Sequence, residues 1–344
     1  MDANTISVPK KGRFGPAFTL MLLAPLIAEV LPGATRMSSI FVFPLEVAIW
    51  GGGAVLIRAA VRHFRLGWLN MFLLACALSV AEEFVIQQTS IAPPIIQIVK
   101  GFPDYARAGG VNYVYFLWAL FYEAVLVVMV PVIVTELLFK DRREDPWMGR
   151  GGALIVGAIF LVACVPAWFL WTQIVREQVF HFAHYTPPAG WVLAGIAAIA
   201  ALVFLALGPS RRAIATRGRS LRPWNPWLLG LAAALASAVW FAISVLAFGI
   251  KPEFPTWIPM TAGLVLAALG LYLLPRMSAH SMWGDCHRMA LAYGASVGTM
   301  AIMFLGFIHA TSALDLYGKL VLDVVAIVFL TWLTRRVAVT RVAA

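Results

Sequence analysis

Residues 112–138 read NYVYFLWALFYEAVLVVMVPVIVTELL, and this stretch decides the fold class. It contains no lysine or arginine, and it is longer than the roughly 20 apolar residues that a helix needs to cross the hydrocarbon core of a bilayer. Similar apolar runs recur along the whole chain of 344 residues, which is 62% hydrophobic and only 12% charged. A soluble domain carries about 25% charged residues, and lipid offers no hydrogen-bond partner to an open backbone. We therefore predict an all-α, polytopic transmembrane helical bundle that forms one membrane domain over residues 1–344.

The apolar runs predict about ten transmembrane spans. The spans lie near residues 14–31, 39–57, 67–92, 112–138, 152–174, 189–208, 226–249, 256–274, 289–309 and 317–334. Of the 26 lysines and arginines, twenty fall in loops or ends on one side of the membrane and six on the other. The six are Arg36, Lys100, Arg107, Arg176, Lys251 and Lys319. Since basic loops stay in the cytoplasm, both termini are predicted to be cytoplasmic, in a bacterial inner membrane.

The net charge of +10 follows from this topology. A basic cytoplasmic surface is attracted to anionic lipid headgroups, so the lipid bilayer is the expected partner. Nucleic acid is not expected as a partner, because the most basic stretch, RRAIATRGRSLR at 211–222, is a short loop between two spans.

Five glutamates lie inside or at the ends of the first four predicted spans, where a charged side chain is costly. With a rise of 1.5 Å per residue, Glu46, Glu83 and Glu123 lie roughly 10, 14 and 17 Å below the outer ends of their spans. Their carboxyl groups should therefore share a slab about 7 Å thick in the outer half of the membrane. Glu29 lies above this slab, at the outer end of the first span. Glu82 flanks Glu83 on another face of the same helix.

Other polar residues accompany these glutamates. On the third span, helical spacing places four of them on one face: Ser79, Glu83, Gln87 and Ser90. Asn112 and Glu123 are eleven residues apart and share a face of the fourth span, and the glycines at 51–53 permit close helix approach below Glu46. We predict a polar pocket among the first four spans, with the following binding residues: Glu29, Glu46, Gln87, Asn112 and Glu123.

No lysine or arginine lies at the depth of these glutamates in any span. Several unpaired carboxylates cannot stay ionised together in a low dielectric, so some must be protonated, bind a cation or face a watery cavity. The simpler alternative is that each buried glutamate only hydrogen-bonds one helix to another. Five converging carboxyls without a basic partner favour a functional cavity. Outside this group, Glu136 with Lys140 and Asp315 with Lys319 have the spacing of i,i+4 ion pairs at the surface.

Three histidines lie near the predicted outer side. His181 and His184 follow the fifth span, and His309 ends the ninth. Imidazoles and carboxylates together ligate zinc and similar divalent ions, so Glu83, His184 and His309 are the candidate ligands if the site holds a metal. The same groups could act on water as general bases. Each histidine taken alone is better explained as an interfacial residue beside aromatic rings.

The adjacent Glu82 and Glu83, followed by Gln87, resemble the EExxxR motif of the CAAX-processing and bacteriocin-processing (CPBP, or Abi) intramembrane proteases. In that family the glutamates, with histidines from FxxxH and HxxxN motifs, activate a water molecule. Here Gln87 replaces the arginine, and Phe180 with His184 matches FxxxH only at a distant position. His309 lacks the asparagine that would follow it. The resemblance implies that Glu82 and Glu83 are the catalytic pair, with His184 and His309 as lesser candidates.

The sequence leaves three functions open. The first is an intramembrane hydrolase in which the glutamates serve as bases or metal ligands. The second is a proton- or cation-coupled transporter, whose buried carboxyls would exchange an ion in each cycle. The third is a non-catalytic membrane subunit.

Overall fold

The structure is a computed structural model that describes residues 14–93, 106–179, 181–209, 220–247, 254–307 and 312–342. The α-helices are α1 (Phe14–Pro25), α2 (Phe43–Glu46), α3 (Gly52–His63), α4 (Trp68–Ala81), α5 (Tyr113–Tyr122), α6 (Val130–Leu138), α7 (Arg150–Phe169), α8 (Ala189–Leu207), α9 (Pro226–Ala247), α10 (Trp257–Ser278), α11 (Asp285–Phe304) and α12 (Ala313–Val342). Strands β1 (Arg107–Ala108) and β2 (Val111–Asn112) form a short antiparallel hairpin in which Ala108 lies opposite Val111.

Several helices are extended by segments of a different helical geometry. Wide π-helical turns occupy Leu26–Val30, Val47–Gly51, Glu82–Ile86, Glu123–Met129 and Leu170–Val179. Tighter 3₁₀ turns occupy Met37–Val42, Lys140–Arg142 and Leu305–Phe307. Most of these segments continue a neighbouring α-helix, so that Tyr113–Leu138, for example, is one long helix with a π-helical middle.

Eight helices of the described chain are long and apolar enough to cross a membrane. They are Met37–His63, Trp68–Ile86, Tyr113–Leu138, Arg150–Gln178, Ala189–Leu207, Pro226–Ile243, Trp257–Ser278 and Ala313–Val339. This agrees with the prediction of an all-α, multi-pass membrane protein. The predicted first span is the shorter apolar helix Phe14–Val30, and the predicted ninth span corresponds to α11.

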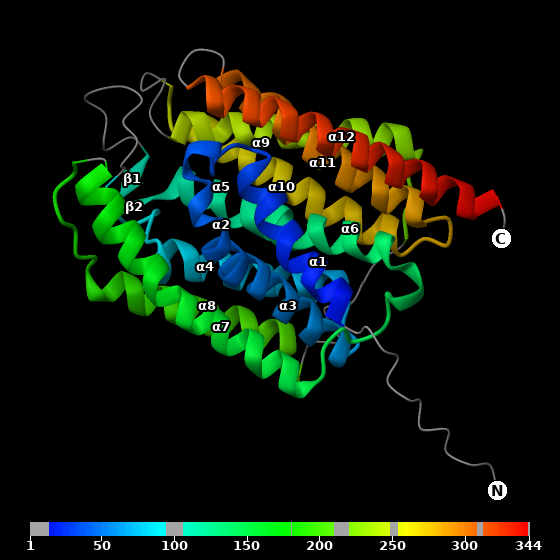
Figure 1. The fold of residues 1–344 in the computed structure, drawn as a ribbon, viewed down its shortest axis with the longest axis horizontal. Helices are drawn as coiled ribbons and strands as arrows, with labels where there is room; N and C mark the ends of the chain where they lie inside the picture. The colour runs from blue at the N-terminus through cyan, green and yellow to red at the C-terminus, as the bar shows by residue number, and fades with distance from the viewer. Residues whose placement is uncertain are drawn as a thin grey trace, which may run out of the picture.

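The helices that carry the glutamates form the centre of the bundle. In Figure 1, α9, α11 and α12 lie along one side, α7 and α8 lie along the other, and the chain from α1 to α6 runs between them. Of the most apolar part of each span, 72% is buried in Trp68–Ile86 and 78% in Tyr113–Leu138, against only 11% in α8 and in α10. The outer helices therefore present their apolar side chains outward, as lipid-facing helices do.

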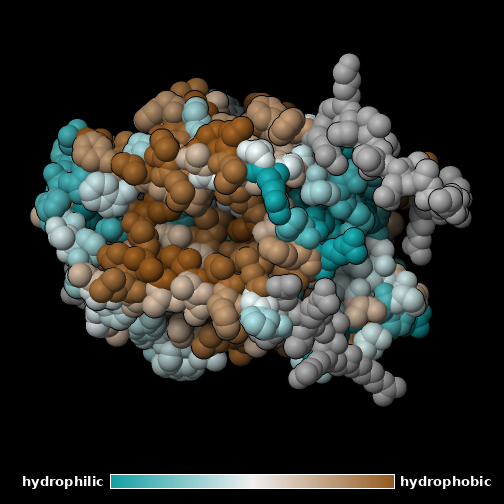
Figure 2. Space-filling model, turned by 90° about the horizontal axis from the view of Figure 1, so that it is seen from below, coloured by the Kyte–Doolittle hydropathy of each residue, from teal (hydrophilic) through white to brown (hydrophobic). Residues whose placement is uncertain are grey.

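One face of the molecule shows how this apolar surface is distributed. In Figure 2, hydrophobic side chains form a broad band across the middle, and hydrophilic side chains gather toward both ends. Exposed members of the apolar surface include Leu154, Leu161, Val162 and Leu193 of α7 and α8. This distribution is what a bundle needs when lipid surrounds its middle and water its ends.

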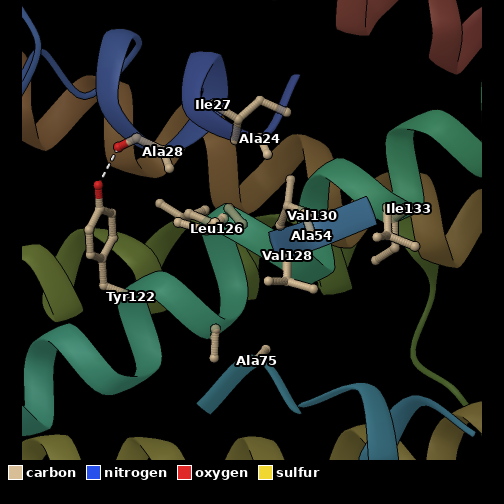
Figure 3. Close-up of a cluster of buried hydrophobic side chains, with 14 of the residues drawn as sticks. Ala24, Ile27, Ala28, Ala54, Ala75, Tyr122, Leu126, Val128, Val130 and Ile133 are labelled. Carbon is tan, nitrogen blue, oxygen red and sulfur yellow. Dashed lines mark hydrogen bonds between the residues drawn. The ribbon is translucent and has the colours of Figure 1, made fainter. Parts of the chain in front are cut away.

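Small residues allow the central helices to approach one another closely. Figure 3 shows Ala24 and Ala28 of the first helix facing Leu126 and Val130, with Ala54 and Ala75 filling the neighbouring gaps. Gly51 confirms the predicted role of the glycine run, because a Cβ there would overlap the backbone carbonyl of Met21. Glycine at this position therefore lets the first helix lie directly against the helix that carries Glu46.

Two predicted ion pairs are wrong, because the chain brings better partners from distant segments. The carboxyl of Glu136 accepts hydrogen bonds from Nε of Arg58 at 3.1 Å and Nη2 of Arg62 at 2.7 Å, not from Lys140. Arg58 is only 1% exposed and lies 3.1 Å from the centre of the Trp147 ring. This buried ion pair joins α3 to α6.

The second incorrect prediction concerns α12. Lys319 is buried and donates to Asp323 at 2.9 Å and to the carbonyl oxygen of Leu31 at 2.5 Å, not to Asp315. Asp315 instead accepts the backbone N–H of Ser38 at 2.9 Å. The contacts with Leu31 and Ser38 join α12 to residues 31–38, which include Thr35.

Candidate functional site

All five predicted glutamates are associated with π-helical turns. Glu29, Glu82, Glu83 and Glu123 lie within such turns, and Glu46 is the residue immediately before one. A π-helical turn contains an extra residue, which rotates the side chains that follow and often marks a functional site. The wide turns therefore set the directions of these carboxyl groups, which regular helical spacing would place elsewhere.

Glu29 and Glu46 form the first half of the site. The hydroxyl of Tyr122 lies within hydrogen-bonding distance of both the Ala28 carbonyl oxygen and Oε1 of Glu29, the latter at 2.6 Å, so its single hydrogen is shared between them (Figure 3). The hydroxyl of Thr35 donates to Oε1 of Glu46. The backbone N–H of Thr35 also donates to the carbonyl oxygen of Glu29 at 3.1 Å. The two carboxyl groups are close enough to interact electrostatically.

Glu82, Glu83 and Glu123 form the second half. The carboxyl groups of Glu83 and Glu123 are in contact, and both interact with Glu82. Glu29 interacts with both Glu82 and Glu123, which joins the two halves. We call these five residues the carboxyl cluster. Its members come from four different helices, and none is more than 9% exposed.

Hydroxyl groups supply the hydrogen bonds of the carboxyl cluster. The Ser90 hydroxyl donates to Oε2 of Glu83 at 2.6 Å, and Ser79 lies beside Glu123. In the described residues, none of the five carboxyls forms an ion pair with a lysine, arginine or histidine. Both carboxyl oxygens of Glu82 are buried without a hydrogen-bond partner in the described chain, as is one oxygen of Glu46 and one of Glu123.

The predicted face of the third span is only partly right. The helix ends at Ile86 and not near residue 92, and Gln88 has a positive φ of 61° that turns the chain. Ser90 therefore contacts Glu83 from a loop that folds back over the end of the helix. The sequence had predicted that both residues lie on the same helix. Sequence spacing identified both residues, but it could not show this return of the chain.

Three side chains hold the loop 87–93 above the carboxyl cluster. Arg107 donates from Nη1 to the carbonyl oxygen of Ile91 at 3.1 Å, and Arg176 donates from Nη1 to that of Pro93 at 2.8 Å. The hydroxyl of Tyr185 donates to the same Ile91 oxygen at 3.0 Å. Burial raises the pKa of Tyr185 above its ordinary value, against the opposing effect of the two arginines, so this hydroxyl keeps its proton.

The two arginines that hold the loop 87–93 were not among the predicted site residues. The sequence places Arg107 and Arg176 in or near outer loops, where they contribute only to the charge count. The aromatic and proline-rich stretch VFHFAHYTPP at 179–188 was the available signal, since Tyr185 comes from it.

Asn112 and Gln87, the two predicted neutral binding residues, have different surroundings. Asn112 is buried; its side chain caps α5 by accepting the N–H of Tyr115 at 3.0 Å, and its backbone N–H donates to the Ser90 carbonyl at 2.9 Å. Asn112 therefore positions the loop over the carboxyl cluster. Gln87 lines a cleft beside the cluster, together with Trp171, Arg176 and Tyr185.

The structure does not bring His184 to the predicted glutamates. Its Nδ1 lies 2.7 Å from Oε1 of Glu177 and its Nε2 lies 3.2 Å from the Thr186 hydroxyl, in an exposed pair at the surface. His309 and Phe180 lie outside the described residues. Over the described ranges, no three histidine, cysteine, aspartate or glutamate side chains are grouped so as to hold one metal ion.

The geometry supports reversible proton or cation binding. Two charged carboxyl groups in contact in a low dielectric repel each other, so the arrangement of the carboxyl cluster suits the sharing of protons or the uptake of a cation. The donating hydroxyls of Tyr122, Thr35 and Ser90 fix the orientation of three carboxyls while leaving other oxygens available.

The chain was compared with known proteins by sequence and by fold. It matches no protein-family model, no curated protein and no solved structure. The resemblance to the CPBP proteases thus rests on residues 82–87 and stays a prediction.

Proposed function

We propose that this chain is a proton-coupled secondary transporter of a bacterial inner membrane, with about ten spans and both termini in the cytoplasm. One observation carries the proposal: five buried carboxyl groups from four central helices interact with one another and receive hydrogen bonds from hydroxyl groups. Buried carboxyls of this kind mark proton relays in pumps and transporters.

The coupling follows from the position of the carboxyl cluster between packed helices. Glu29, Glu46, Glu83 and Glu123 belong to four helices, so any relative movement of these helices changes the distances between their carboxyl groups. Bringing two carboxyls together favours binding of a shared proton, and separating them favours its release. A cycle of helix movement would therefore take up a proton on one side of the membrane and release it on the other.

The test measures solute uptake driven by a proton gradient. The purified protein in proteoliposomes is given an acidic exterior and a panel of radiolabelled small solutes. We expect at least one solute to accumulate, and this accumulation to be lost in Glu83→Gln, which keeps the size of the side chain and its contact with Ser90. Glu177→Gln, which removes an exposed carboxylate outside the carboxyl cluster, should transport normally. Accumulation that persists after the gradient is collapsed, or in Glu83→Gln, contradicts proton coupling.

An intramembrane hydrolase is the second candidate, favoured by the adjacent, fully buried Glu82 and Glu83. Activation of water needs a base within hydrogen-bonding reach of it. We place this candidate second because His184 pairs with Glu177 at the surface. Cleavage of a membrane peptide by the purified protein, abolished in Glu83→Gln, would reverse this order. A non-catalytic subunit would instead show a stable partner in pull-downs and normal behaviour of every glutamate variant.

A further inference from the structure

Residues 31–38, which we call the linker, connect the helix that carries Glu29 to the helix that carries Glu46. The first part of the linker is not helical. Thr35 lies within it and is only 6% exposed. The Thr35 hydroxyl donates to Glu46, and its backbone N–H donates to the Glu29 carbonyl oxygen at 3.1 Å. The position of the linker therefore decides whether Thr35 can contact both glutamates.

Polar side chains of α12 hold the linker at both of its ends. Nζ of Lys319 donates to the Leu31 carbonyl oxygen at 2.5 Å. The Asp315 carboxylate accepts the backbone N–H of Ser38 at 2.9 Å and the Ser38 hydroxyl at 3.0 Å. Thr35 lies between these two points of attachment. One helix thus fixes the part of the chain from which Thr35 donates.

Two glycines allow the linker to lie directly against the helices beside it. Gly33 has a φ of 84°, a left-handed conformation that suits glycine, and a Cβ there would overlap the Phe307 ring at the end of α11. On α12, a Cβ at Gly318 would overlap the side chain of Met37. The linker is therefore closely packed as well as hydrogen-bonded, so a movement of α12 cannot leave it unaffected.

The charge of Lys319 is costly at this position. Lys319 is only 3% exposed, it pairs with Asp323 at 2.9 Å, and its Nζ lies 5.6 Å from the centre of the Phe307 ring. Apolar residues of similar volume often stabilise a protein as well as a buried ion pair does, or better. A hydrogen bond to the Leu31 carbonyl is directional, however, and fixes one position of the linker where an apolar contact would not. Positioning explains this ion pair better than stability does.

We infer that α12 acts as a clamp on the linker, in which Lys319 and Asp315 are positioning residues that hold Thr35 against Glu46 and Glu29. Both act through the linker and not by bonding to these two carboxyl groups. A movement of α12 relative to the first helix would withdraw the Thr35 hydroxyl from Glu46 and so change proton binding there. This last step rests on the proposed function, whereas the clamp itself does not.

The test is infrared spectroscopy of the full-length protein in lipid. The band of Glu46, protonated or ionised, is assigned by its loss in Glu46→Gln. Thr35→Val removes the donating hydroxyl and defines the shift that the loss of this hydrogen bond causes. We expect Lys319→Met, which keeps a long side chain but removes the donor, to move the Glu46 band in the same direction. Since Lys319 acts through Thr35, the double variant should show no larger shift than Thr35→Val alone.

Glu136→Gln is the matched control, because it breaks a buried ion pair between α3 and α6 that does not involve the linker. It should destabilise the protein and leave the Glu46 band unmoved. Asp315→Ala, which removes both bonds to Ser38, should shift the band as Lys319→Met does, and it decides the question alone if Lys319→Met does not fold. An unmoved Glu46 band in the folded variants, an additive shift in the double variant, or an equal shift in Glu136→Gln would overturn the inference.

Uptake measurements separate the clamp from the proposed function. If the wild type shows proton-driven uptake, Lys319→Met should slow it several-fold. The expected shifts of the Glu46 band, without any uptake by the wild type, would support the clamp and contradict the transporter. Proton-driven uptake by the wild type, with an unmoved Glu46 band in Lys319→Met, would support the transporter and contradict the clamp.

Discussion

Glu82 is the member of the carboxyl cluster with the fewest favourable contacts. It is fully buried, and neither of its oxygens has a hydrogen-bond partner in the described chain. A buried carboxyl group without a hydrogen-bond partner lowers the stability of the folded protein by roughly 1–3 kcal/mol. Its presence at this position therefore points to a role other than stability.

Replacing Glu82 by methionine should therefore stabilise the protein. Methionine has a similar volume and no polar atoms to bury, so we expect unfolding to become harder by about 1–3 kcal/mol. The matched control is Glu83→Met, which leaves the buried Ser90 hydroxyl without its acceptor and should destabilise the protein. Thermal unfolding in detergent measures both. A loss of stability in Glu82→Met equal to that in Glu83→Met would show that Glu82 has a structural partner.

Sequence reasoning at this scale found the acidic residues but not their partners. The lack of any lysine or arginine at the depth of Glu46, Glu83 and Glu123 was sufficient to predict that the carboxyls would interact. Tyr122 and Thr35 were not predicted, because an aromatic residue or a threonine beside an apolar run gives no signal that it will donate to a distant carboxylate.

At the scale of single elements, the close contact at Gly51 fixes how the first helix packs against the helix that carries Glu46. A Cβ at Gly51 would overlap the Met21 carbonyl, which is backbone and cannot move aside, whereas a Cβ at Gly52 would lie at an ordinary distance of 3.6 Å from Phe160. The two positions are adjacent and both helical, so they form a natural pair for comparison.

Gly51→Ala should destabilise the protein by about 1–3 kcal/mol through overpacking. Gly52→Ala should be neutral or stabilising by up to about 1 kcal/mol, because alanine favours the helix. Thermal unfolding of both variants in one detergent tests the difference. Equal stability of the two would mean that the first helix does not pack on Gly51.

The Arg58–Glu136–Arg62 ion pair is the strongest polar link between elements at the other end of the bundle. Glu136→Gln leaves Arg58, which is only 1% exposed, without a carboxylate and leaves Arg62 with Glu144 alone, so it should lower the free energy of unfolding by about 3–5 kcal/mol. Glu144→Gln removes a carboxylate that also pairs with Arg62 but is 78% exposed. It should lower the free energy of unfolding by no more than about 1 kcal/mol. Denaturation of the two variants, measured side by side, should separate them clearly; similar costs would argue against a buried ion pair.

Element boundaries were predicted well where apolar runs are continuous and poorly where the chain turns. Residues 112–138 were predicted as one span, and the helix covers Tyr113–Leu138. The third span was extended past Ile86 because the apolar residues Ile91 and Ala92 follow shortly after it, but the helix ends at Ile86 and the positive φ of Gln88 turns the chain. The ion pairs of Glu136 and Lys319 were wrong because local spacing cannot show the distant arginines and carbonyls that compete for them.

At the scale of the whole molecule, the polar groups lie inside and the apolar surface lies outside. The two most buried spans, Trp68–Ile86 and Tyr113–Leu138, carry Glu82, Glu83 and Glu123, whereas the outer helices expose their leucines and valines. This arrangement is expected for a helical bundle whose working groups are shielded from lipid by a ring of apolar helices.

The most direct test of a shared carboxyl cluster is infrared difference spectroscopy of the protein in lipid, recorded across a change of pH. The C=O stretching bands of protonated carboxyls report each of the five glutamates, and single Glu→Gln variants assign them. Mutual interaction predicts that Glu83→Gln removes its own band and also shifts the bands of Glu82 and Glu123. Five bands that disappear one at a time, with all the others unmoved, would contradict a shared cluster.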